Sequence, residues 1–213
     1  MLKRNPPSIH PAEAALLVID MQKAFLDPAG VMYLPQAAEI IPAVARAVQL
    51  CRAAGMAIVW TRMSHDALPG ASYCELFPQH FNENGSPLLR CNTPDYEIPP
   101  ELGLQPSDIY VDKTAYSAFH GTDLEERLRG LGCDTTVICG IATNVCCEST
   151  ARDAFALGFR VIVLSDATAA GSRQAHEASL RTLALAFGWV LTTDELLSAI
   201  LAEGPGSLVQ PSA

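Results

Sequence analysis

Six short apolar segments constrain the fold of this 213-residue chain more than any other feature of its sequence. Each has the length of a strand, is rich in β-branched residues and is apolar almost throughout rather than at every second position. They cover residues 15–20, 57–62, 108–113, 135–140, 160–166 and 189–193. Such runs are typical of strands buried on both faces of a parallel sheet. We therefore expect a six-stranded, mostly parallel sheet.

Helical patterns separate these segments. They cover residues 36–54, 122–130, 145–157 and 172–187, and a glycine ends most of them. Pro42 lies inside the first pattern and should limit or bend its first turns. Alternation of strands with helices predicts an α/β fold in three layers, α/β/α and Rossmann-like, with helices on both faces of the sheet.

The length of the chain suits one sizeable core. We expect a single domain over residues 1–213, with its core at about 14–200 and a loose tail at 204–213. The stretch 63–107 is irregular and rich in proline, asparagine and aromatic residues. An irregular segment of this length in a compact domain is more often a functional lid or an oligomer contact than a linker. We interpret it as a lid that sets specificity.

Composition narrows the possible partners and the compartment. A formal net charge of −9 argues against binding to nucleic acid or to an anionic membrane, and leaves a small-molecule substrate open. No apolar window is long enough to span a bilayer, and the N-terminal segment lacks the pattern of a signal peptide. The seven cysteines are an odd number, which favours reduced thiols and a cytoplasmic protein.

Three reactive residue types follow or end three of the predicted strands. In an open α/β sheet, ligands bind outside the carboxyl ends of the strands. Asp20 ends the first run, Lys113 ends the third, and Cys146 comes shortly after the fourth. Separately they could be a helix cap, a solvated strand end and a buried small side chain. Together they predict an activated nucleophile with an acid–base partner and an electrostatic helper.

The thiol lies near a predicted helix start. Asn144 reads as an N-cap, which would place Cys146 in the first helical turn, where the helix dipole favours a thiolate. Lys113 would act in the same direction, and Asp20 could accept the thiol proton.

Cys147 follows Cys146 directly, so the pair has other interpretations. A disulfide between neighbours is strained. The chain lacks the paired CxxC and HExxH spacings of zinc sites. No glycine-rich turn follows the first strand, which argues against a dinucleotide site. Neighbours on a helix point about 100° apart, so only one of the two thiols can face a given pocket.

The segments LLVIDMQKAF, VDKTAYSAF and GIATNVCCEST resemble the motifs of the isochorismatase-like superfamily, in its cysteine-hydrolase branch. The resemblance covers about residues 14–200 and implies the isochorismatase-like hydrolase fold. The matching positions are Asp20, Gln22, Phe25, Lys113, Tyr116, Ser117, Phe119, Gly140, Thr143 and Cys146. It implies a triad in which Cys146 is the nucleophile, Asp20 the base and Lys113 its partner. Cys147 is then a packing residue.

The resemblance also bears on the turn before the nucleophile. It implies a non-proline cis peptide bond between Ile141 and Ala142. We expect the backbone N–H groups of Ala142 and Cys146 to form the oxyanion hole.

The motif cysteine favours hydrolysis of amides over vinyl ethers, and its turn is similar to those of ureidoacrylate, biuret and N-carbamoyl amide hydrolases. We expect a cysteine-dependent hydrolase that cleaves a small amide or ureido C–N bond through a thioester and releases ammonia. The residues that build the metal site of nicotinamidases are missing from the region after the second strand, so no metal or cofactor is expected. His65, in that region, reads as ordinary loop polarity.

Three alternatives remain open. One is a nicotinamidase-like or other hydrolase of the family. Another is a non-catalytic binding protein that keeps the fold. The last is a redox protein that uses Cys146 and Cys147.

Candidates for the wall of the substrate pocket come from the motifs and from 63–107. They are Gln22, Phe25, Arg62, Tyr73, Phe77, Phe81, Arg90 and Tyr116. Arg62 or Arg90 could hold a substrate carboxylate in a bidentate pair, which would favour ureido acids. The competing interpretation for each arginine is a surface ion pair. The resemblance further implies a homo-oligomer, a dimer or tetramer, in which a neighbouring subunit completes the long loop.

Overall fold

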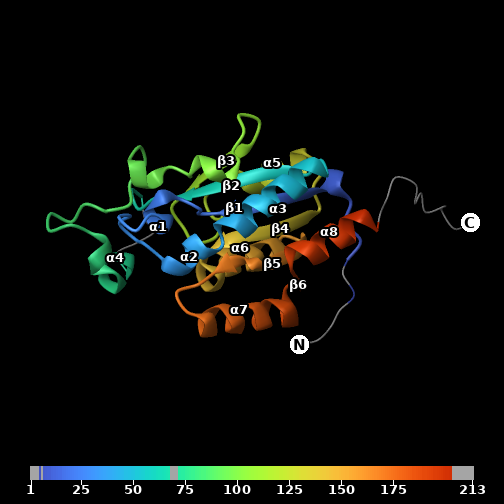
Figure 1. The fold of residues 1–213 in the computed structure, drawn as a ribbon. Helices are drawn as coiled ribbons and strands as arrows, with labels where there is room; N and C mark the ends of the chain where they lie inside the picture. The colour runs from blue at the N-terminus through green and yellow to red at the C-terminus, as the bar shows by residue number, and fades with distance from the viewer. Residues whose placement is uncertain (1–4, 6, 68–71, 203–213) are drawn as a thin grey trace, which may run out of the picture.

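A computed structural model describes residue 5, residues 7–67 and residues 72–202; the tail expected at 204–213 lies outside these described residues. Its centre is a six-stranded sheet with the order β3-β2-β1-β4-β5-β6, in which every pairing is parallel (Figure 1). The strands are β1 (Ala14–Ile19), β2 (Ala57–Met63), β3 (Ile109–Lys113), β4 (Thr135–Ile141), β5 (Arg160–Ala169) and β6 (Trp189–Leu191). The predicted six-stranded parallel sheet is confirmed.

Helices lie on both sides of this sheet (Figure 1). They are α1 (Lys23–Leu26), α2 (Pro35–Glu39), α3 (Ile41–Ala53), α4 (Ser72–Leu76), α5 (Leu124–Gly130), α6 (Glu148–Ala156), α7 (Arg173–Ala186) and α8 (Thr193–Leu201). The pattern at 36–54 forms two helices rather than one, because Pro42 is tolerated only in the first turn and α3 starts beside it.

The alternation of side chains along β1 separates two apolar cores. Leu16 and Val18 point to the face covered by α3 and α8, where they join one buried cluster. Leu17 and Ile19 point to the other face, where a second cluster includes side chains of α5, α6 and α7. Successive strand residues face opposite sides of a sheet, so β1 is buried on both. The predicted three-layer α/β/α arrangement is confirmed.

The sheet reverses its order of strands between β1 and β4. Successive strands are added on one side of β1 up to β3, and β4 then pairs on its other side. Such a switch point is the usual place for a ligand, outside the carboxyl ends of the strands. Gly140 allows a close approach there: its φ is +105°, and a Cβ on it would lie 2.1 Å from the carbonyl oxygen of Ile19.

The segment 63–107 leaves the carboxyl end of β2. It carries α4 and three short 3₁₀ helices, η2 (Pro78–His80), η3 (Pro94–Tyr96) and η4 (Pro100–Leu102), between irregular stretches. In Figure 1, α4 lies at the end of the molecule where α1 follows β1. This part of the segment therefore lies at the carboxyl edge of the sheet.

Candidate active site

Asp20, Lys113 and Cys146 meet at the carboxyl edge of the sheet. Lys113 Nζ lies 2.7 Å from Asp20 Oδ2 and 3.5 Å from Cys146 Sγ. The three residues are 1%, 2% and 8% exposed, respectively. Charged groups are rarely buried unless they are paired. The sheet therefore holds a carboxylate, an ammonium and a thiol in contact and almost out of water.

Asp20 is fixed by a neighbouring strand. It directly follows β1 with a φ of 50°, in the left-handed region. Its backbone N–H donates to Thr61 Oγ1 over 3.0 Å, and the Thr61 hydroxyl donates to Asp20 Oδ1 over 2.6 Å. Thr61 is fully buried near the end of β2. It was not among the predicted site residues, although its place at a strand end beside Asp20 is a signal that could have found it.

Lys113 ends β3 and pairs in register with Met63 of β2. Its ammonium also donates to the Ala115 carbonyl oxygen over 3.1 Å and lies 3.6 Å from the Met63 sulfur. Burial alone would lower the pKa of Lys113, but the charges and hydrogen bonds of Asp20 and Cys146 outweigh it, and the pKa is raised. Lys113 is therefore a cation throughout the neutral range.

Cys146 lies in an unusually wide turn. The peptide bond between Ile141 and Ala142 is cis, at the position that the family resemblance implies. A π-helical turn, η5 (Thr143–Cys147), follows, and the Cys147 N–H donates to the Ala142 carbonyl oxygen over 3.1 Å. Ala142 is its N-cap residue, without a side-chain cap. The prediction that Asn144 caps a helix was wrong, because the helical turn begins one residue before it.

Helix α7 supports this turn from outside. Thr143 Oγ1 and His176 Nδ1 are 2.9 Å apart. Ser179 Oγ lies 3.2 Å from the Thr143 carbonyl oxygen and 2.5 Å from Glu148 Oε2. These contacts tie the first residue of η5 and the first residue of α6 to one helix, so the position of Cys146 between them is well supported.

Burial disfavours the thiolate form of Cys146. Burial raises the pKa of Cys146 to about 12, with Lys113 acting in the opposite direction and Asp20 adding to the rise. The expectation that a helix start would favour a resting thiolate was therefore wrong, because loss of hydration outweighs the nearby positive charges. A nucleophilic thiolate must come from proton transfer inside the site.

Cys147 differs from its neighbour in its surroundings. It is completely buried in the apolar cluster beneath η5 and α6, and burial raises its pKa well above the usual range. All seven cysteines are free thiols.

A cavity of about 270 Å³ lies next to Lys113, whose ammonium contacts Met63 and Ala115 of its lining, while none of the three residues is itself part of that lining. It is lined by Met63, Ser72, Tyr73, Leu76, Phe77, Thr114, Ala115, Tyr116 and His120. Tyr73, Phe77 and Tyr116 were predicted to line it. Burial raises the pKa of both tyrosines, and the nearby Cys146 raises it further, which places the two rings within electrostatic reach of the thiol.

The other predicted wall residues do not line this cavity. Arg62 forms a bidentate pair with Asp112, at 2.7 and 3.0 Å, and its guanidinium stacks on Tyr96 and Tyr110. The reason is the alternation of β2, which sends Arg62 to the face opposite Met63. This ion pair matches the competing interpretation for Arg62, and a role of Arg62 in binding substrate stays a prediction.

Arg90 is exposed and pairs with Asp66 at 3.2 Å; it is not among the residues that line the cavity, and its role in binding substrate stays a prediction. Gln22 is fully buried, and its amide is used by the backbone of Met63 and Tyr96. Phe25, in α1, packs against two of the buried apolar clusters. Neither Gln22 nor Phe25 lines the cavity, because both brace the chain after β1. Phe81 is also outside it, and its ring packs on Tyr73.

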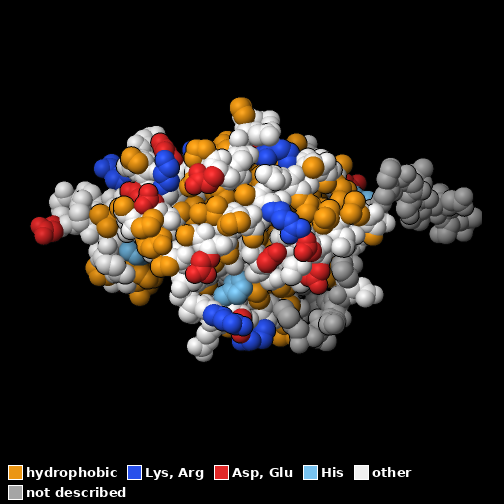
Figure 2. All heavy atoms as spheres, in the orientation of Figure 1, with side chains coloured by type: hydrophobic (Ala, Val, Ile, Leu, Met, Phe, Trp, Pro, Cys, Tyr) orange, Lys and Arg blue, Asp and Glu red, His pale blue; other side chains and the backbone are white. Residues whose placement is uncertain are grey.

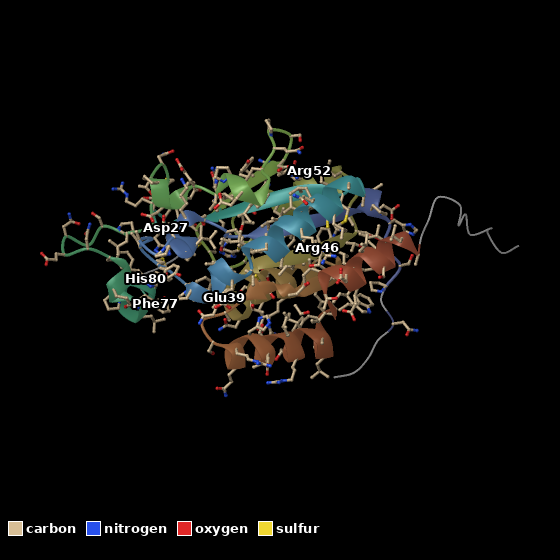
Figure 3. The ribbon with its side chains drawn as sticks, viewed as in Figure 1. Asp27, Glu39, Arg46, Arg52, Phe77 and His80 are labelled. Atoms are coloured by element: carbon tan, nitrogen blue, oxygen red, sulfur yellow. The ribbon has the colours of Figure 1, made fainter. Side chains whose placement is uncertain are left out.

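His65 lies in the loop after β2, where it was predicted to be an ordinary polar residue, and it is only 4% exposed. The Tyr73 hydroxyl oxygen lies 3.0 Å from His65 Nε2 and 2.8 Å from His80 Nδ1. Burial lowers the pKa of His65 to about 4 and lowers that of His80, so both imidazoles are neutral near pH 7. Figure 3 shows His80 beside Phe77, and the two rings stack at 5.2 Å.

These histidines do not fit a metal site. The Tyr73 hydroxyl is hydrogen-bonded to one nitrogen of each ring, and the Asp66 carboxylate accepts hydrogen bonds from Arg90 and Cys91. Within residues 5, 7–67 and 72–202 there is no group of three or more side chains of the types that bind metals. Zinc sites need three or four such ligands.

Known proteins resemble this chain over most of its length. Residues 14–195 match the family described as the isochorismatase domain. A ureidoacrylate amidohydrolase RutB of Methylobacterium radiotolerans is 36% identical over 215 residues, which cover 92% of this chain and 83% of the relative. Nicotinamidase 3 of Arabidopsis thaliana is 36% identical over 205 residues, 93% of each chain.

Solved structures agree with this. A cysteine hydrolase from Pseudomonas syringae superposes with a TM-score of 0.85 at 34% identity, over 95% of this chain and 100% of that one. A pyrazinamidase of Pyrococcus horikoshii, solved in complex with zinc, superposes with a TM-score of 0.72 at 33% identity, over 84% and 99%. No helix in the described part of the chain is long and apolar enough to cross a membrane.

Proposed function

The chain belongs to the isochorismatase family, and from that premise we propose that it is a cysteine-dependent hydrolase of small amides or ureido compounds that releases ammonia. The amidohydrolase and the nicotinamidase among its relatives support hydrolysis of a non-peptide C–N bond. The observation that carries the proposal is the contact of Lys113 Nζ with both Asp20 and Cys146, at 2.7 and 3.5 Å.

The first step makes the nucleophile. Asp20 takes the thiol proton of Cys146, and the charge of Lys113 stabilises first the carboxylate and then the thiolate. The proton stays inside the site, so the summed formal charge of the three groups is zero before and after the transfer. This step explains how a thiol with a pKa of about 12 can react near neutral pH.

The thiolate of Cys146 then attacks the substrate carbonyl carbon, and a C–S bond forms. The backbone N–H groups of Ala142 and Cys146 donate to the resulting oxyanion. As the tetrahedral intermediate collapses, the C–N bond breaks and Asp20 gives its proton to the leaving nitrogen. Ammonia or an amine departs, and a thioester remains on Cys146.

Water completes the reaction. Asp20 takes a proton from the water while its oxygen attacks the thioester, the C–S bond breaks, and the proton returns to the sulfur. For an amide the product is a carboxylic acid. For a ureido substrate the acyl product is a carbamate, which decomposes to carbon dioxide and the nitrogen it retained: ammonia if an amine left first, and an amine if ammonia left first.

An ammonia-release screen tests the proposal. The panel contains nicotinamide, biuret, ureidoacrylate, N-carbamoyl amino acids and simple amides. Wild-type enzyme should release ammonia from at least one compound, Cys147→Ala should retain this activity, and Cys146→Ala should lose it. Full turnover by Cys146→Ala, or no release from any compound, would refute the proposal.

We extend the proposal to the setting of the enzyme. Seven free thiols fit a reducing compartment, the cytoplasm. We also propose the homo-oligomer, a dimer or tetramer, that the family resemblance implies. Light scattering on the purified enzyme should give the mass of a dimer or tetramer, and the mass of one chain would contradict this.

A further inference from the structure

The described wall of the cavity is mainly apolar and aromatic, with His120 as its one imidazole. Its described lining contains no lysine, arginine, aspartate or glutamate, and most of its side chains are apolar or aromatic. The neighbouring residues 68–71 are Leu, Pro, Gly and Ala in the sequence, so they bring no charged side chain either. A charged substrate group would find no charged partner among these side chains.

Charges around the cavity are already balanced. Asp112 neutralises Arg62, and Asp66 neutralises Arg90. Figure 2 shows acidic and basic side chains scattered among apolar ones over one face of the molecule, without a broad positive field. Lys113 is paired with Asp20, so among the described residues these pairs leave no lysine or arginine beside the cavity free to bind a carboxylate.

The Tyr73 hydroxyl sets the polarity of the wall. Its oxygen is in hydrogen-bond contact with a nitrogen of His65 and a nitrogen of His80. One hydroxyl proton can serve only one imidazole, so the other imidazole must donate its N–H to the Tyr73 oxygen. Whichever ring donates, the Tyr73 hydroxyl has already used its own proton, so its oxygen can only accept a further hydrogen bond. A substrate group at this position must therefore be a donor, such as an amide or ureido N–H, and not an anion.

From these observations we propose that the cavity selects an uncharged amide with an apolar or aromatic body, and excludes amides that carry a carboxylate. This inference rests on the proposed function and names the substrate class of the same site. It replaces the expectation that an arginine would favour ureido acids. A carboxylate that loses water without gaining a partner pays a large desolvation cost.

Matched amides test the inference. Benzamide is compared with 4-carbamoylbenzoate, and butyramide with succinamate, so that the members of each pair differ by one carboxylate. Ammonia release is measured at pH 8, where imidazoles in general are neutral. We expect kcat/KM to be at least about tenfold higher for the neutral member of each pair, equivalent to about 1.4 kcal/mol. A smaller ratio, or preference for the acid, would overturn the inference.

A new cation at the mouth of the cavity should reverse the selectivity. Leu76 is exposed, so Leu76→Arg leaves the core intact. We expect this variant to shift the ratio of kcat/KM values towards the acid by about tenfold. Arg90→Gln is the matched control, and its ratio should equal that of the wild type. A selective loss of activity on the acids in Arg90→Gln would show that Arg90 binds them and would refute the inference.

Binding separates failure of the inference from failure of the proposed function. Calorimetry on Cys146→Ala measures the affinity for benzamide and for 4-carbamoylbenzoate without turnover. Benzamide should bind at least about tenfold more tightly. Equal affinities, or no binding of either compound, would overturn the inference even if other amides are hydrolysed. Absence of ammonia release with selective binding of benzamide would refute the proposed function alone.

Discussion

The two halves of the site are built differently. The catalytic floor consists of Asp20, Lys113 and Cys146, which lie at or shortly after the carboxyl ends of strands β1, β3 and β4. These side chains are nearly inaccessible to solvent and include a buried ion pair. The aromatic wall, residues 72–80, consists of the short helices α4 and η2 at one end of the molecule (Figure 3). Within it, Tyr73 and His80 share a hydrogen-bond chain with His65.

The difference separates chemistry from selectivity. Charges buried on a rigid sheet are held in place, because the neighbouring strands fix their backbones, and this suits a reaction that needs precise proton transfer. Short helices outside the sheet can change in sequence without disturbing it. Substitutions in the floor should therefore change kcat, and substitutions in the wall should change KM and the choice of substrate.

The nucleophile gives the largest expected effect. Cys146→Ala should lower kcat/KM by at least about a thousandfold, because no other group replaces the attacking sulfur. Cys147→Ala is the matched control and should keep most of the activity while losing some thermal stability, since it leaves a small cavity in the core. Steady-state kinetics and thermal melts measure both. An inactive, well-folded Cys147→Ala enzyme would show that the floor was assigned to the wrong thiol.

Replacing the base should change the pH profile as well as the rate. In wild-type enzyme the proton moves from Cys146 to Asp20 within the site, so kcat/KM should stay nearly flat from pH 7 to 9. In Asp20→Asn the thiolate must come from loss of a proton to solvent. Burial, the largest cause of the raised pKa of Cys146, persists in this variant. Its residual rate should therefore rise about tenfold per pH unit over this range. A wild-type rate that rises equally steeply would exclude internal transfer.

Thr61 should give an intermediate effect, because it positions Asp20 without touching substrate. Thr61→Val removes the hydroxyl that accepts a hydrogen bond from the Asp20 backbone N–H and donates one to the Asp20 carboxylate. We expect kcat to fall by about ten- to a hundredfold with little change in KM. Thr136→Val, at a buried strand position away from the site, is the control and should leave kcat unchanged. A wild-type kcat in Thr61→Val would show that Thr61 does not position Asp20. The same conclusion would follow if Thr61→Ser, which keeps the hydroxyl, were no more active than Thr61→Val.

The wall should give the smallest effect. Tyr73→Phe keeps the ring but removes the hydroxyl shared by His65 and His80. We expect a rise in KM of about three- to tenfold for neutral amides, with kcat nearly unchanged. Tyr33→Phe, at an exposed position outside the cavity lining, is the control. A large fall in kcat without a change in KM would place Tyr73 in the chemistry and erase the distinction between wall and floor.

The floor could be located from the sequence because it depends on regular structure. Apolar runs identify the strands, and the carboxyl ends of parallel strands meet at one edge, so Asp20 and Lys113 were expected at that edge, although β2 lies between their strands. The turn at Cys146 was harder. Propensity rules describe α-helix starts, and they pointed to Asn144, whereas the chain forms a π-helical turn after a cis peptide bond.

The wall could be located only in part. Tyr73, Phe77 and Tyr116 line the cavity, but the contacts among His65, Tyr73 and His80 join residues of an irregular segment that has no period to follow. The ion pair of Arg62 follows from the register of the strands. Arg62 pairs in register with Asp112, next to Lys113 on the same strand, so alternation along β2 and β3 sends both members of this pair away from the catalytic face.

The most direct test of the account is to find where the substrate's acyl group is attached during turnover. Enzyme is mixed with its best neutral amide, quenched in acid within the first turnovers, and analysed by tandem mass spectrometry with fragmentation between Cys146 and Cys147. The account predicts one acyl adduct, on Cys146, which is absent from Cys146→Ala. An adduct on Cys147 or on any other residue would contradict it. Steady turnover without any adduct, together with full activity of the Cys146→Ala enzyme, would also contradict it.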